Sequence, residues 1–287
     1  MKSFLVVFNN NSGTKEAYSF KKIIYQKLSK AGVNFRFVFI DIIPIMRDLD
    51  KYDTIITVGG DGTINTFLPY LVNKNKTLGI IPIGTANLLA AKLKIPLNVS
   101  KALDVILEGN TKKIDTALIN DKPFILRTGF GYDAKIINNT PRIWKRKMGY
   151  FAYVLNGFFQ IFRLKQKRYV LKYEDKKLIV NATSLIVANA GNMYRNLVSV
   201  SHKSKIDDGR FDVFLLRSSN FFTFVIEFIK IILNIKITTK NVIYFKTDSI
   251  KIKTEETALH VDGEKTKSEE NYLMKILPDS LNVYYKK

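Results

Sequence analysis

The chain has 287 residues, 46% of them hydrophobic, so it can bury a sizeable core and is not a disordered chain. It has no cysteine and only two histidines, which excludes disulfides, thiolate metal sites and histidine-rich metal sites. Lysine and arginine outnumber aspartate and glutamate by 46 to 25, and this charge of +21 favours nucleic acid, an anionic membrane or phosphate-bearing ligands.

The first part of the chain alternates strand and helix patterns. Apolar runs predict strands at residues 4–8, 34–41, 53–58 and 77–84. Residues 14–32 have the apolar spacing of a helix, and a further helix is predicted from Asn65, with Pro69 in its first turns. This alternation predicts a parallel sheet with helices on both faces, in an N-terminal α/β domain over residues 1–115.

The pattern changes to short strands and hairpins over residues 116–278, which predicts a mostly antiparallel β-rich domain. Residues 112–131 predict two strands joined at Asn120 and Asp121. The basic and aromatic segment 141–168 predicts a helix that either belongs to the core or meets an anionic membrane surface. Residues 220–236 predict a buried or interfacial helix, since charged residues interrupt them too often for a membrane span.

Small and acidic residues follow the strand at residues 53–58, in the order Gly59, Gly60, Asp61, Gly62, Thr63. Ligands of open α/β sheets bind at this carboxyl edge. Glycine permits positive φ and lacks Cβ, so a polyanion can approach the main chain, and the next helix adds N–H donors. A plain tight turn is the alternative interpretation. The aspartate would act through a cation or through hydrogen bonds that shape the loop.

Two other strand ends carry similar residues. The first strand is followed by Asn9, Ser12 and Gly13, and the strand at residues 77–84 by Thr85 and Asn87. Parallel strands place such ends on one edge of the sheet. Neither the dinucleotide fingerprint nor the P-loop pattern occurs.

These segments resemble the diacylglycerol kinase catalytic domain, and most closely the soluble bacterial lipid kinases of the diacylglycerol/sphingosine kinase superfamily. The pairing of VGGDGTIN with GIIPIGTANLLA carries the likeness. The G-G-D-G-T segment alone would be less specific, since NAD kinases share it. NNNSG stands where the family has N-P-x-S-G, KIDDGRFDVFLL resembles its metal-site segment, and HVDGE resembles its D-G-E.

The resemblance implies a nucleotide-binding α/β domain, NAD-kinase-like or Rossmann-like, and a β-rich lipid-binding domain, with the active site in the cleft between them. It also implies that a last strand, residues 279–287, returns to the first domain. Asp61 would act through the Mg²⁺ of the nucleotide. The ATP-binding residues that it implies are Asn9, Asn10, Asn11, Ser12, Gly13, Gly59, Gly60, Asp61, Gly62, Thr63, Ile64, Asn65 and Thr85.

In the second domain the resemblance implies a structural Mg²⁺ bound by the Asp208 carboxylate and the carbonyls of Lys205 and Arg210. It makes Glu264 the general base for the lipid hydroxyl, assisted or oriented by Asp262, although either carboxylate could take the proton. The alternatives are an exposed Asp-Gly turn at Asp208 and a polar hairpin turn at Asp262. The nearby His260 is interpreted as a space-filling residue and not as a catalytic one.

Several positions depart from the family pattern. Asn10 and Asn11 leave the first loop without its proline, Thr66 stands where glutamate is usual, and His202 stands where proline is usual. The segment 189–209 lacks the family's glycine cluster, which bears on lipid choice and turnover.

The sequence therefore predicts a lipid kinase that depends on ATP and Mg²⁺ and acts on diacylglycerol or a similar lipid at the inner membrane surface. We expect a cytoplasmic protein in peripheral contact with anionic membrane, no nucleic acid as partner, and a homodimer as an open alternative. An NAD kinase, or a catalytically weak regulator that binds lipid or nucleotide, are the rival interpretations. Lysine as a generic surface residue would also explain the charge.

Overall fold

The computed structural model describes two compact units, one formed by Met1–Ile114 with Asp279–Lys287 and the other by Asp115–Pro278. They are called the N-terminal unit and the β unit below. The described residues are 3–9, 15–40, 49–141, 144, 155–157, 165–190, 192–193, 198–199, 205–218, 223, 226–227 and 239–287.

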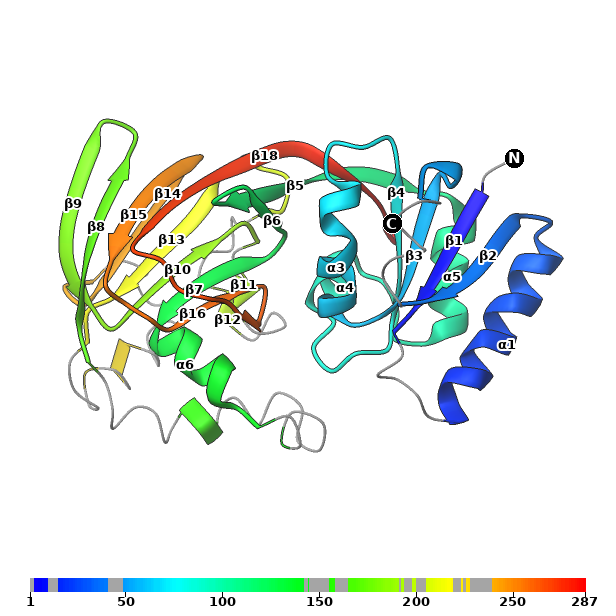
Figure 1. Ribbon diagram of the computed structural model, residues 1–287, viewed down its shortest axis with the longest axis horizontal. Helices are drawn as coiled ribbons and strands as arrows, with labels where there is room; N and C mark the ends of the chain where they lie inside the picture. The colour runs from blue at the N-terminus through cyan, green and yellow to red at the C-terminus, as the bar shows by residue number, and fades with distance from the viewer. Residues whose placement is uncertain are drawn as a thin grey trace. The chain divides into compact units, whose positions relative to one another are not determined.

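A parallel sheet forms the centre of the N-terminal unit, in the order β2-β1-β3-β4-β18 (Figure 1). Its central strands are mostly apolar and are buried along nearly their whole length, as expected for strands covered on both faces of the sheet. The strands are β1 (Ser3–Phe8), β2 (Asn34–Phe39), β3 (Thr54–Gly59), β4 (Thr77–Pro82) and the end of β18 (Asn271–Tyr284).

The helices of this unit are α1 (Lys15–Lys30), α3 (Asp61–Leu71), α4 (Leu88–Lys92) and α5 (Val99–Glu108), with a short 3₁₀ helix at Leu49–Lys51. Helices α1 and α5 contact each other and are joined by an ion pair between Lys27 and Asp104. The crossovers β1–β2 and β3–β4 run in opposite directions along the sheet, so right-handed connections place α3 on the other face.

The prediction for α3 was wrong at its start. The helix begins at Asp61 and not near Asn65, so Pro69 lies in its last turn instead of its first turns. The glycine-rich segment is itself the first turn of the helix. The glycine pattern was interpreted as a loop, so residues 61–64 were not predicted to be helical.

The β unit is built from antiparallel strands in two sheets. One sheet has the order β14-β13-β10-β7-β16-β17, formed by β14 (Val242–Thr247), β13 (Phe211–Leu216), β10 (Ser184–Ala188), β7 (Arg127–Gly131), β16 (Leu259–Val261) and β17 (Glu264–Lys265). The other has the order β18-β15-β8-β9, with β15 (Ser249–Thr254), β8 (Lys167–Tyr173) and β9 (Lys176–Ala182); β5 (Thr111–Ile119) pairs with β18 and with β6 (Lys122–Phe124). Helix α6 (Tyr132–Asn139) and the small hairpin β11 (Asn192–Met193) and β12 (Val198–Ser199) complete the described elements.

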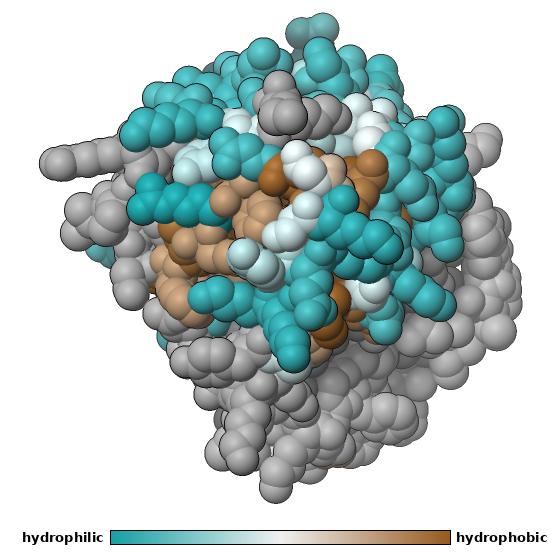
Figure 2. Space-filling model, turned by 90° about the vertical axis from the view of Figure 1, so that its right-hand side faces the viewer, coloured by the Kyte–Doolittle hydropathy of each residue, from teal (hydrophilic) through white to brown (hydrophobic). Residues whose placement is uncertain are grey.

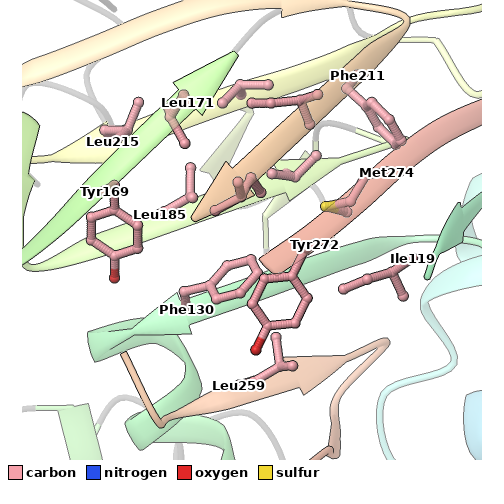
Figure 3. Packing of buried hydrophobic residues seen from close by; sticks show 14 of the residues in the cluster. Ile119, Phe130, Tyr169, Leu171, Leu185, Phe211, Leu215, Leu259, Tyr272 and Met274 are labelled. Carbon is pink, nitrogen blue, oxygen red and sulfur yellow. The ribbon is translucent and has the colours of Figure 1, made fainter. Parts of the chain in front are cut away.

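Apolar side chains from both sheets form one core in the β unit (Figure 3). Phe130 of β7 meets Tyr272 of β18 edge to face, with ring centroids 5.0 Å apart. Phe124 stacks on Phe211 at 6.1 Å. This core confirms the prediction of a separate antiparallel β-rich body, and the parallel N-terminal sheet confirms the α/β prediction.

The segments predicted as helices at residues 141–168 and 220–236 lie mostly outside the described residues. No helix in the described part of the chain is both long enough and apolar enough to cross a membrane.

Candidate functional site

The ends of β1, β3 and β4 lie together at the carboxyl edge of the N-terminal sheet. The main-chain N–H of Asn9 donates to Val58 O at 3.4 Å, and Ile83 N donates to Gly59 O at 3.0 Å. The side-chain amide of Asn9 donates to Thr63 Oγ1 at 3.1 Å. The structure thus brings these predicted residues together, as parallel strand ends require.

The loops after β3 and β4 touch through glycine. A Cβ on Gly60 would lie 3.1 Å from Gly84 Cα, and a Cβ on Gly84 would collide with Gly60 Cα. A Cβ on Gly59 would likewise collide with Thr63. Gly60 has φ −104°, and the described glycines with positive φ are Gly32, Gly109, Gly131, Gly209 and Gly263. Gly60 therefore lacks the expected positive φ. At Gly59, Gly60 and Gly84, glycine is needed because a side chain would collide with, or press against, the neighbouring residue.

Asp61 shapes the neighbouring loop. Its Oδ2 accepts the N–H of Leu88 at 3.0 Å, and its Oδ1 accepts the N–H of Leu89 at 3.2 Å. A carboxylate in this position satisfies two otherwise orphan donors at the start of α4 and complements the helix dipole. Of the two roles that the sequence left open for Asp61, this geometry supplies the hydrogen-bonding one.

Asn87 was not among the predicted binding residues, although it fixes the Gly84–Asn87 loop. It has φ 49°, and only 4% of its surface is exposed. Its Oδ1 accepts the N–H of Gly84 at 3.0 Å, and its Nδ2 donates to Gly84 O at 2.7 Å. The residue type could have indicated this role, since asparagine tolerates the left-handed region and its side chain can hydrogen-bond to the main chain of its own loop.

The other predicted ATP-binding residues differ in accessibility. Thr63 and Ile64 are each 2% exposed, so Ile64 could serve a ligand only through its main chain. Asn65 is half-buried and Thr85 is exposed. The side-chain hydroxyl of Thr66 donates a hydrogen bond to Gly62 O, one helical turn earlier, at 3.1 Å. The predicted residues Asn10, Asn11, Ser12 and Gly13 lie outside the described residues.

These loops suit an anionic ligand. Helix α3 starts directly after Gly60, so the first turn of the helix presents main-chain N–H groups and the positive end of its dipole at the sheet edge. The absence of side chains at the glycines lets a phosphate group approach that main chain.

In the β unit, the D-G-E segment forms a tight hairpin turn between β16 and β17. Asp262 and Gly263 have φ 48° and 85°, which matches the type I′ turn that Asp-Gly favours. Glu264 follows in β17, opposite Val261, and is exposed. The polar hairpin that was the alternative interpretation is therefore present, and it displays the glutamate.

Asp262 holds this turn against the segment between β6 and β7. Its Oδ2 accepts Ile125 N at 2.7 Å, and its Oδ1 accepts Leu126 N at 2.7 Å and Arg127 N at 2.8 Å. The N–H of Asp262 donates to Arg127 O at 2.8 Å. Because these amides face a carboxylate instead of a strand, the second strand predicted within residues 112–131 is broken into β6 and β7.

A buried polar network lies beside the turn. Asp133 of α6 is 4% exposed; its Oδ1 accepts Arg127 Nη1 at 3.2 Å, and its Oδ2 is 2.7 Å from His260 Nε2. Burial opposes ionisation, but Arg127 and His260 outweigh it and hold the pKa of Asp133 at about 2. A Cβ on Gly129 would collide with Asp133 and His260, so the pair needs glycine there. No sequence pattern pointed to this network, because its members lie on three separate elements.

The Asp208 turn is neutralised by a lysine. Lys246 Nζ lies 2.7 Å from Asp208 Oδ2 and 3.6 Å from Asp212 Oδ1, while Asp208 Oδ1 accepts Arg210 N at 3.2 Å. Lys205 and Arg210 are exposed. Among the described residues, no group of three or more histidine or carboxylate side chains could hold a metal ion. With an ammonium group on its carboxylate, this turn does not fit the structural Mg²⁺ that the resemblance implied.

Comparison with known proteins gives matches to both halves of the chain. Residues 3–119 match the diacylglycerol kinase catalytic domain, and residues 127–285 match the YegS C-terminal NAD kinase beta sandwich-like domain.

Named relatives and a solved structure agree with these matches. A diacylglycerol kinase of Bacillus subtilis (strain 168) is 28% identical over 220 residues, 75% of this chain and 72% of the relative. One of Staphylococcus aureus (strain Newman) is 31% identical over 173 residues, 60% of this chain but only 55% of the relative. A crystal structure of a candidate diacylglycerol kinase from Bacillus anthracis str. Sterne has a TM-score of 0.82 at 23% identity, covering 99% of this chain and 95% of that one, so it shows a shared fold.

Proposed function

Since the chain belongs to the family that joins a diacylglycerol kinase catalytic domain to a YegS-type C-terminal domain, we propose that it is an ATP-dependent lipid kinase. The acceptor is a hydroxyl of diacylglycerol or of a related lipid. The observation that carries the proposal is the contact of the Gly60 and Gly84 loops at the sheet edge, where α3 begins.

In this proposal the triphosphate of ATP lies against the N-terminal turn of α3 and the adjoining glycine loops. The main-chain N–H groups there offset its charge without rearranging, because Asp61 and Asn87 already hold the loops. Mg²⁺ bound together with the nucleotide would supply further charge neutralisation. Phosphoryl transfer depends chiefly on such alignment and charge stabilisation.

Glu264 is the general base. The lipid hydroxyl oxygen forms a bond to the γ-phosphorus, the bond from that phosphorus to the β–γ bridging oxygen breaks, and the hydroxyl proton passes to the Glu264 carboxylate. Glu264 is exposed, whereas the Asp262 carboxylate accepts three main-chain N–H groups. This difference favours Glu264 over Asp262 for proton transfer and leaves Asp262 as the residue that orients the turn.

We also propose peripheral contact with anionic membrane at the inner membrane surface, through aromatic and basic residues of α1 and β2. Tyr25 and Phe39 are 56% and 45% exposed, and Lys21 Nζ lies 5.6 Å from the ring centre of Phe39. Figure 2 shows an apolar area edged by polar residues on the side where α1 and β2 lie. Exposed aromatics with neighbouring cations suit a membrane interface.

One experiment tests the proposed activity. The protein is incubated with γ-labelled ATP, Mg²⁺ and a total lipid extract, and the labelled product is identified; parallel arms contain NAD or no acceptor. Label in a lipid supports the proposal. Label in NAD would support the rival that the C-terminal match to an NAD kinase-like domain keeps open, and no transfer in any arm would support a regulator.

The membrane contact has its own measurement. Sedimentation with vesicles of phosphatidylglycerol and phosphatidylcholine should decrease for the double variant Tyr25→Ser and Phe39→Ser. Unchanged sedimentation would contradict the surface proposed here. A change from dimer to monomer without loss of binding would assign the aromatic face to a homodimer.

A further inference from the structure

The turn that carries Glu264 is fixed from two sides, and only one side is the Asp262 carboxylate. On the other side the main-chain N–H of Gly263 donates to His260 Nδ1 at 3.2 Å. Gly263 lies directly before Glu264. The direction in which Glu264 leaves the turn is therefore tied to the ring of His260.

The contacts of His260 define its tautomer. Because Nδ1 accepts the N–H of Gly263, it carries no proton, and the ring proton is on Nε2. Nε2 then donates to Asp133 Oδ2 at 2.7 Å. Asp133 is held ionised by Arg127 Nη1 at 3.2 Å and accepts this proton as an anion. The chain of bonds runs from Arg127 through Asp133 and His260 to Gly263.

Packing leaves the ring no freedom to leave this position. His260 is fully buried, and Gly129 of β7 presents bare main chain to the imidazole and the carboxylate, since a Cβ would collide with both. A histidine that only filled space would not require a buried anion on one nitrogen and a turn amide on the other.

We propose that His260 is a positioning residue for Glu264, which sets the orientation of the base through the hydrogen bond from Gly263 N to its Nδ1. This inference rests on the proposed function, because it concerns the base of that reaction. Asp133 and Arg127 act one step further away, by fixing the tautomer that leaves Nδ1 free to accept. A base displaced by even ~1 Å costs up to roughly a hundredfold in rate.

Two amide substitutions separate the bonds that His260 makes. In His260→Asn the shorter side chain can place its oxygen near the Nδ1 position, which preserves the bond from Gly263 but not the one to Asp133. In His260→Gln the longer side chain can place its NH₂ near Nε2, which preserves the bond to Asp133 but removes the acceptor for Gly263. Both are amides, so they change the charge of the core equally.

We expect kcat for lipid phosphorylation to fall by about tenfold or more in His260→Gln and by clearly less in His260→Asn, with KM for ATP similar in both. Amide hydrogen exchange at Gly263 should become faster in His260→Gln than in His260→Asn. Equal loss of kcat in the two variants, with equal exchange at Gly263, would overturn the proposal.

The nitrogen NMR spectrum of the unmodified protein tests the tautomer even if a variant fails to fold. Protonated Nε2 and bare Nδ1 on His260 support the proposal, and the reverse assignment overturns it. If the unmodified protein transfers no phosphate to lipid, the proposed function fails. The exchange at Gly263 and the tautomer would then still show whether His260 holds the turn.

Discussion

Gly60 and Gly84 lie against each other without room for a side chain on either: a Cβ on Gly60 would lie 3.1 Å from Gly84 Cα, and one on Gly84 would collide with Gly60 Cα. The same residues therefore close the contact between two loops and leave main chain open to a ligand. This contact means that the strand-end loops cannot be altered independently.

Gly84→Ala should weaken both folding and ATP binding. The added methyl group must separate the two loops, and overpacking of this kind costs about 1–3 kcal/mol. Thermal unfolding and ATP titration measure the two effects. Gly109→Asn is the control for ATP binding, because a Cβ at Gly109 meets nothing within 4 Å, although the φ of 79° strains any side chain there and should itself cost some stability. Equal behaviour of the two variants would contradict this account.

Asp61→Asn should lower the free energy of unfolding by about 1 kcal/mol, because an amide cannot accept from both Leu88 N and Leu89 N. The Gly84–Asn87 loop should loosen as a result, and KM for ATP should rise. Denaturant unfolding without nucleotide isolates the first effect. Unchanged stability, together with an altered Mg²⁺ dependence of the rate, would instead assign Asp61 to the metal of the nucleotide.

Glu264→Gln should lower kcat by about 10²–10⁴-fold, the usual contribution of a general base. Its stability should change by less than about 0.5 kcal/mol, because the side chain is exposed. Steady-state kinetics with lipid micelles and a thermal melt give both values. The matched control is Glu255→Gln, another exposed glutamate of the β unit. An unchanged kcat in Glu264→Gln would show that Glu264 is not the general base.

The Asp208 turn should not need a divalent cation for its stability. Lys246 already provides the positive charge, 2.7 Å from the carboxylate. We therefore expect the same Tm for the nucleotide-free protein in EDTA and in Mg²⁺. Lys246→Met should lower Tm, since it leaves Asp208 and the buried Asp212 without this cation. A lower Tm of the unmodified protein in EDTA would instead support a structural metal ion at this turn.

Asp133 should make stability depend on pH in acid. Its pKa is about 2 in the folded protein against 3.8 for the ordinary group, so it stabilises the fold above pH 3.8 and this contribution is lost as the pH falls towards 2. Urea unfolding between pH 5 and pH 2 measures the slope. Asp133→Asn should flatten the part of the slope below pH 3.8. An unchanged slope in that variant would place the acid sensitivity elsewhere.

The sequence predicted those parts of the fold that have a local cause. Apolar runs located β1, β3 and β4, and the residues that follow them were predicted to meet because parallel strands end on one edge. The Asn120–Asp121 turn was also found, and both residues have positive φ as a two-residue hairpin requires.

What the sequence could not show depends on contacts distant along the chain. The break between β6 and β7 is caused by Asp262, more than 130 residues later. The partner of His260 is Asp133, also far away, so the histidine appeared to be a filler. Lys246 opposes Asp208 only because β14 and β13 pair, and neither sequence segment indicates the other.

Strand β18 has a consequence for synthesis of the protein. Its last residues pair with β4, and the N–H groups of Tyr285 and Lys286 then donate to Asn110 O and Leu93 O. A ribosome releases these residues only after the rest of the chain described here. The edge of β4 stays without its parallel neighbour until then, so a nascent chain stopped at residue 278 should be captured by chaperones that recognise exposed strands.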